Sequence, residues 1–158
     1  CWGTTQADAD RFLQEIGLVA EQEGTAATWR LVLPDPPVPE LRGVESNLTL
    51  TVPPGVTAAT SNRHGPTTIA GIAGGTTVRS RHGAVTVRGL AGRLAISNGH
   101  GAVRAERVAG GTIENEHGSV YAGVVEGDLT VRNRHGSVTV DTLSGDLEVN
   151  NEHGDVDL

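Results

Sequence analysis

The sequence has no lysine, no methionine, one cysteine and only four aromatic residues in 158. Aromatic side chains ordinarily supply much of a compact core, so valine, leucine, isoleucine and alanine must build this one. A single cysteine excludes an internal disulfide and a zinc site made of thiolates. No apolar run approaches the ~20 residues of a membrane-spanning helix, so no transmembrane segment is expected. The net charge of −7 argues against nucleic acid as the partner.

Glycine, in contrast, is abundant: its 22 copies are about twice the usual share. The glycines do not recur every third residue, which excludes collagen. Instead, every histidine is followed by glycine, at intervals of 18, 18, 17, 18 and 18 residues: His64, His82, His100, His117, His135 and His153. A second glycine comes ten residues after each of the first five: Gly74, Gly92, Gly110, Gly127 and Gly145. Two glycine positions that recur with the same fixed period indicate a repeat array.

Apolar residues keep fixed distances from each histidine and alternate with polar ones. Four residues before it stand Val78, Ile96, Ile113, Val131 and Val149, and three residues after it stand Val85, Val103, Val120, Val138 and Val156. Alternation with period two predicts strands, two in each coil, with a third short strand left open. Coils that stack ~4.8 Å apart bury these columns against one another. The fold class predicted for 47–158 is therefore all-β: a single-stranded parallel β-solenoid, or β-helix, of about six 18-residue coils.

The one short interval is placed between Gly110 and His117, where Gly111 stands in place of the usual leucine. We interpret it as a tightened corner in the third coil and not as the end of the array.

Residues 1–46 are not repetitive and are predicted to form a small cap over the open end of the solenoid. A short amphipathic helix is predicted over 5–16, followed by strands over 18–21 and 28–33 that form a hairpin. Four prolines between 34 and 39 exclude regular structure there. A further strand is predicted over 47–52.

A polar column lies two residues before each histidine: Asn62, Ser80, Asn98, Asn115, Asn133 and Asn151. Side-chain amides that stack in register hydrogen-bond along the column, so a structural ladder is predicted. On the outer surface, Arg134 lies one coil from both Glu116 and Glu152, and Arg132 lies one coil from Glu114, which predicts ion pairs between coils.

Two segments carry a resemblance to a known family: NLTLTVPPGVTAATSNRHG at 47–65 and GSVTVDTLSGDLEVNNEHGDV at 136–156. They resemble the entry and the repeat of a bacterial adhesin-type β-solenoid family of unknown function, over roughly 18–158. The resemblance implies a right-handed, non-catalytic solenoid of the cell envelope or extracellular space. It supplies no catalytic residues to carry over. The histidine before each glycine departs from that family's pattern.

The histidine column is the sharpest candidate site. Imidazoles ~4.8 Å apart suit Zn, Ni or Cu, and below pH ~6.5 they would charge and repel one another. The competing interpretation is a structural corner that was duplicated with the coil. The column has no complementary catalytic groups beside it, so we expect no enzyme.

Charge is distributed unevenly along the chain. Residues 1–60 carry 3 Arg and 8 acidic residues, 61–107 carry 7 Arg and 1 acidic residue, and 108–158 carry 2 Arg and 10 acidic residues. The net charges are therefore −5, +6 and −8. Two interpretations remain open: random variation of the charges on a solvated surface, or oriented self-association of neighbouring molecules. An uncapped last coil would add end-to-end stacking.

The predicted function is a structural or adhesin-like envelope solenoid that stacks with itself or contacts a surface ligand. The alternative is a metal- or pH-responsive binding module that uses the histidine column. Cys1 matches the first residue of a mature bacterial lipoprotein and predicts a lipid anchor, although a chance chain boundary explains it equally.

Overall fold

The computed structural model describes residues 2–3, 17–23, 26–32, 41–43 and 55–158. The chain divides into two compact units, Cys1–Leu50 and Thr51–Leu158, and each is considered by itself. The domain boundary predicted between 46 and 47 falls within 44–54, outside the described residues.

The first unit contains two antiparallel strand pairs. Strand β2 (Gly17–Glu23) pairs with β3 (Ala26–Val32), which confirms the predicted hairpin. Strand β1 (Trp2–Gly3) pairs with β4 (Leu41–Gly43), a pairing that the sequence analysis did not anticipate. The predicted helix over 5–16, the proline-rich connection and the strand over 47–52 lie outside the described residues. The role of this unit as a cap stays a prediction.

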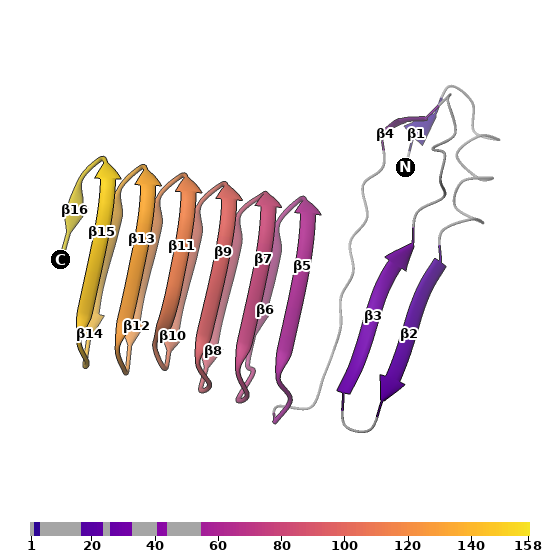
Figure 1. The fold of residues 1–158 in the computed structure, drawn as a ribbon, viewed down its shortest axis with the longest axis horizontal. Coiled ribbons are helices and arrows are strands. Elements are labelled where there is room, and N and C mark those ends of the chain that lie inside the picture. The colour runs from indigo at the N-terminus through magenta and orange to yellow at the C-terminus, as the bar shows by residue number, and fades with distance from the viewer. Residues whose placement is uncertain (1, 4–16, 24–25, 33–40, 44–54) are drawn as a thin grey trace. The chain divides into compact units, whose positions relative to one another are not determined.

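The second unit is the predicted parallel β-solenoid, with two strands in each of six coils (Figure 1). The first strands of the coils form one six-stranded sheet, here called the odd sheet: β5 (Ala58–His64), β7 (Thr76–His82), β9 (Leu94–His100), β11 (Gly111–His117), β13 (Leu129–His135) and β15 (Leu147–His153). The second strands form the even sheet: β6 (Thr67–Ala70), β8 (Val85–Leu90), β10 (Val103–Val108), β12 (Val120–Val125), β14 (Val138–Leu143) and β16 (Val156–Asp157). No third strand appears in the coils of 55–158.

The core is the set of inward columns that the two-residue alternation predicted. Eighteen hydrophobic residues of the solenoid are buried, and all are valine, leucine, isoleucine or alanine. In β9, for example, Leu94, Ile96 and Asn98 are buried while Ala95 and Ser97 are exposed. Each inward residue therefore packs on the equivalent residue of the next coil, and a few identical thin layers replace one bulky aromatic centre.

The third coil corrects one placement made from the sequence. Gly111 pairs with Leu94 and Leu129, and the whole of β11 continues in register with both neighbouring strands. The missing residue therefore lies between Val108 and Gly111, not between Gly110 and His117. In the coils on either side this corner has three residues, 91–93 and 126–128, whereas here Ala109 and Gly110 alone turn the chain. The tightened corner itself is confirmed, and the array continues through it.

Candidate functional site

The corner after each histidine is fixed by close packing of backbone on backbone. Gly118, which follows His117, has a φ of +125°, and a Cβ added there would lie 2.4 Å from the carbonyl oxygen of Gly101 in the preceding coil. Only glycine tolerates both conditions. This corner ends every strand of the odd sheet at the same height. It therefore also places the histidine side chains in one column that crosses the coils.

The six histidines stack face to face, as their equal spacing predicted. Ring centroids of successive histidines lie 5.1, 4.9, 4.6, 4.9 and 4.8 Å apart, from His64 to His153, and the ring planes differ by 10–26°. The column therefore runs through all six coils without a gap.

Two histidines of the column, His82 and His135, have a lowered pKa. The pKa of His82 is lowered, first by loss of hydration within the stack and then by the positive charges of His100, His64 and Arg81. The pKa of His135 is lowered by the same loss of hydration and by His153, His117 and Arg134, with Glu152 opposing them. Both shifts favour neutral imidazole, which is the form that binds metal.

Ring orientation, however, does not bring metal ligands together. The lone pairs of an imidazole lie in the plane of its ring, so near-parallel stacked rings direct their nitrogens side by side and not toward a shared ion. Within 55–158, no three His, Cys, Asp or Glu side chains are grouped so that they could hold a metal ion. Rotation of the rings would be needed before Zn, Ni or Cu bridged two coils.

The predicted asparagine ladder forms beside the column, on the inward side of the strands. Each amide nitrogen donates to the next amide oxygen: Asn98 to Asn115 at 2.9 Å, Asn115 to Asn133 at 3.0 Å and Asn133 to Asn151 at 3.1 Å. Each of these nitrogens also donates to the carbonyl of the glycine three residues later, for example Asn115 to Gly118 at 2.9 Å. The ladder thus holds neighbouring coils together and fastens every histidine corner from within.

Ser80 interrupts the ladder in the second coil. Its hydroxyl and the Asn98 amide oxygen above it are both buried, and neither finds a hydrogen-bond partner in the described part of the chain. Asn62, isolated on the other side of the gap, donates instead to Gly65 and Thr67. The first two coils are therefore fastened less completely than the last four.

Cross-coil ion pairs line the outer face of the odd sheet. Arg132 lies 3.5 Å from Glu114 and 4.0 Å from Glu148, and Arg134 lies 3.1 Å from Glu152. The predicted pair of Arg132 with Glu114 is confirmed, whereas Arg134 pairs with Glu152 alone of its two predicted partners. A shallow polar trough of about 530 Å³ crosses this face between β7 and β15.

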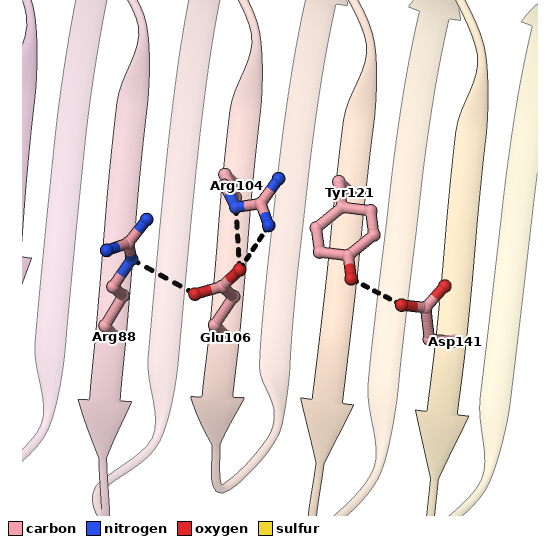
Figure 2. A network of polar contacts seen from close by, with 5 residues as sticks. All are labelled: Arg88, Arg104, Glu106, Tyr121 and Asp141. Atoms are coloured by element: carbon pink, nitrogen blue, oxygen red, sulfur yellow. Dashed lines mark hydrogen bonds and ion pairs between the residues drawn. The ribbon is translucent and has the colours of Figure 1, made fainter.

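The even sheet carries a polar network that the sequence analysis missed (Figure 2). Glu106 accepts from Arg104 at 2.7 Å and pairs with Arg88 at 3.1 Å. The Arg104 guanidinium lies 4.3 Å from the centre of the Tyr121 ring, and the Tyr121 hydroxyl donates to Asp141. These contacts lower the pKa of Glu106, chiefly through the Arg104 hydrogen bond, and raise the pKa of Tyr121, chiefly through Asp141.

This network spans four consecutive coils, β8 to β14. Its charged groups are already partnered with one another, so it stabilises neighbouring coils and leaves no free group to act on a ligand. The sequence signal was available, because Arg88, Glu106 and Asp141 share one outward column, but that column was not compared across coils.

No family model, curated protein or solved structure matches the chain. No helix in the part of the chain that the structure describes has the length and hydropathy needed to cross a membrane. The candidate site therefore rests on the histidine column, the asparagine ladder and the two charged outer faces.

Proposed function

We propose that the chain is a non-catalytic structural element, an adhesin-like solenoid of a bacterial envelope or extracellular surface that associates with its own copies. One observation carries this proposal. The histidine, asparagine and core columns of 55–158 continue in register from coil to coil, so the surface is built from repeats of one pattern. Catalysis needs an asymmetric cluster of complementary groups, and this repetition works against one.

The charge distribution supports self-association as the use of such a rod. Seven of the twelve arginines lie in 61–107, and ten of the nineteen acidic residues lie in 108–158. Neighbouring coils pair a few of these charges, but the basic coils and the distant acidic coils of one stiff element cannot meet within a molecule. They can meet between two molecules. The envelope location rests on the family resemblance, and mass spectrometry of native material tests whether Cys1 carries a lipid.

Sedimentation velocity over a range of protein concentration and salt tests the proposal, with electron microscopy of the same samples. We expect assemblies at low ionic strength that dissociate as salt screens the charges, and no response to EDTA. A monomer at every concentration and ionic strength would contradict the proposal.

The continuous imidazole stack favours a second candidate, a pH- or metal-responsive binding module. In that case the state of the column controls binding: the rings are stacked when neutral and repel one another once acid charges them. Titration of Zn²⁺ or Ni²⁺ into the protein would then release or absorb heat and raise the unfolding temperature, and EDTA would reverse both. Absence of both signals removes the metal version and leaves the pH version to the acid-unfolding experiment in the Discussion.

A further inference from the structure

The third coil leaves a gap in the charged outer face of the odd sheet. The outward residues of β9 are Ala95, Ser97 and Gly99, all small. A Cβ added at Gly99 would lie 2.8 Å from the carbonyl oxygen of Arg81, so a larger residue there requires the neighbouring strand to shift. The gap is therefore built into the backbone packing of β9 against β7.

Opposite charges stand on the two sides of this gap. Strand β7 presents Arg79 and Arg81 outward, and β11 presents Glu114 and Glu116. These strands are two coils apart, ~10 Å at the usual strand spacing, and no ion pair joins them. Within 55–158, Arg79, Arg81 and Glu116 form no ion pair at all, whereas Glu114 pairs with Arg132.

We infer that a second copy of this chain docks on this face, with its order of coils reversed, about a twofold axis that runs along β9 in the plane between the two sheets. The axis places β7 of each copy opposite β11 of the other. Arg79 then faces Glu114 of the second copy and Arg81 faces its Glu116, because these residues share heights across β7, β9 and β11, and symmetry makes each pair twice. The small residues of β9 meet at the axis and let the two sheets approach closely.

The charge pattern selects this axis over its neighbours. An axis through β11 brings Glu114 and Glu116 against their own copies at the centre. An axis between β9 and β11 brings β7 against β13 and therefore arginine against arginine. Five overlapping strands of seven residues would cover on the order of 1,100 Å² in total, from strand length and spacing, which is near the lower limit for a specific interface. A weak, salt-sensitive dimer is expected.

One contact in this arrangement is unfavourable and gives the inference a distinctive signature. The axis sets β5 opposite β13, so Arg63 faces Arg134 of the second copy. Arg63→Ala should therefore leave the dimer unchanged or tighten it. General attraction between the basic and acidic coils would instead weaken when Arg63 is removed.

This inference rests on the proposed self-association and specifies its surface. The test is sedimentation velocity of Arg81→Glu, Glu116→Arg and the double variant at low ionic strength, with circular dichroism to confirm folding. Each single variant opposes like charges at both symmetric contacts, so association should weaken about tenfold or more, at up to ~1 kcal/mol per exposed pair. The double variant restores opposite charges across the interface and should recover the wild-type association.

Matched controls place the same charge changes at corners away from this face: Arg93→Glu, Glu126→Arg and their combination. They should leave association near the wild-type value. If the wild type associates but Arg81→Glu and Glu116→Arg do so equally well, the twofold face is wrong while the proposed function stands. If the double variant stays as weak as the singles, the pairing of these two residues is wrong. A wild type that is monomeric throughout overturns both proposals.

Discussion

The first three coils of the solenoid and the last three are made from one repeat, but they satisfy their polar groups to different extents. In the last three coils the asparagine ladder is continuous and Arg132 lies between glutamates of both neighbouring coils. In the first three, Ser80 breaks the ladder and leaves two buried oxygens without partners in the described residues. Arg63 and Arg81 also follow each other in one outward column. A repeat therefore fixes geometry, whereas stability depends on which side chain fills each place.

Backbone strain follows the same division. Arg107 in β10 has a φ of +52°, and the equivalent places in the two preceding coils, Gly71 and Gly89, are also positive. No residue at the corresponding places of β12 and β14 has a positive φ. The first half is thus the less relaxed part, and its unpaired arginines remain available to another molecule.

The strongest way to break the well-satisfied half is Gly118→Ala. Positive φ alone costs of order 1–3 kcal/mol for a residue with a side chain, and the added Cβ would also collide with Gly101 at 2.4 Å. We expect a loss of about 4 kcal/mol or more in the free energy of unfolding, measured by urea denaturation.

Gly65→Ala is the matched control in the first coil. Its φ is +97°, but no atom of the described residues lies within 4 Å of the added Cβ. It should lose only the conformational part, about 1–3 kcal/mol. Equal losses at the two glycines would show that contact between coils does not fix the corner.

Asn115→Ala should have the next largest effect. Asn115, 4% exposed, donates to Asn133 and Gly118 and accepts from Asn98, so its loss leaves several buried groups unpaired. We expect about 2–4 kcal/mol at ~1–3 kcal/mol per unsatisfied group. Asn62→Ala, at the isolated end of the ladder, should cost about 1 kcal/mol. A cost at Asn62 as large as that at Asn115 would contradict the ladder's role.

The glycine corners and the asparagine ladder show which features a repeat sequence predicts and why. A fixed period and strict alternation determine register, so the strands, core columns and the file of histidines were all predictable, as was the ladder. Gly110 was matched by its distance from His100, and this put the missing residue on the wrong side of Gly111. The backbone bonds of the corner, Leu94 to Gly110 and Gly111 to Asp128, decide its position, and spacing alone does not encode them.

Side-chain choices among equivalent partners were also beyond the sequence. Arg134 lies one coil from both Glu116 and Glu152, and the structure pairs it with Glu152 alone. The contact of Arg104 with the Tyr121 ring joins unlike residues, which no repeat pattern indicates. Rotamers and local packing settle such contacts after the register is fixed.

Ser80→Asn should repair the weaker half. The new amide would donate to the Asn98 oxygen, which has no partner among the described residues, and to the carbonyl of Gly83. We expect a gain of about 1 kcal/mol in the free energy of unfolding, the net worth of a typical hydrogen bond. Ser80→Ala is the control, because it removes the unpaired hydroxyl without extending the ladder. If alanine stabilises as much as asparagine, the missing ladder bonds carry no cost.

Arg107→Gly tests the strain in β10. Glycine adopts a φ of +52° without the cost of about 1–2 kcal/mol that a side chain brings to the left-handed region, but it also loosens the unfolded chain. A net gain of up to about 1 kcal/mol is expected by urea denaturation. A decrease in the free energy of unfolding would mean that contacts of the Arg107 side chain stabilise the fold by more than its backbone conformation costs.

Acid should affect the two halves in turn. The effect per histidine should be the smallest of those predicted here, because His82 is exposed and His135 is only half-buried. A histidine whose pKa is lowered on folding binds fewer protons in the folded state than in the unfolded one. Its contribution to stability is therefore complete above the unfolded value of 6.5 and is lost as pH falls from there toward the lowered folded pKa. This applies to His82 and His135, so the unfolding temperature should fall as the pH drops below about 6.5.

The two histidines differ in their surroundings, and the difference separates the halves. The charged groups that lower the pKa of His82, namely His64, His100 and Arg81, are all positive. Around His135, Glu152 partly offsets the positive charges that lower its pKa. His82→Gln should therefore remove more of the acid sensitivity than His135→Gln, measured as the change in unfolding temperature between pH 7 and about 5. At mildly acidic pH, the backbone amides of β5 and β7 should exchange their hydrogens before those of β13 and β15. Equal opening of both ends would mean that the column titrates as one unit and that neighbouring carboxylates do not set its order of loss.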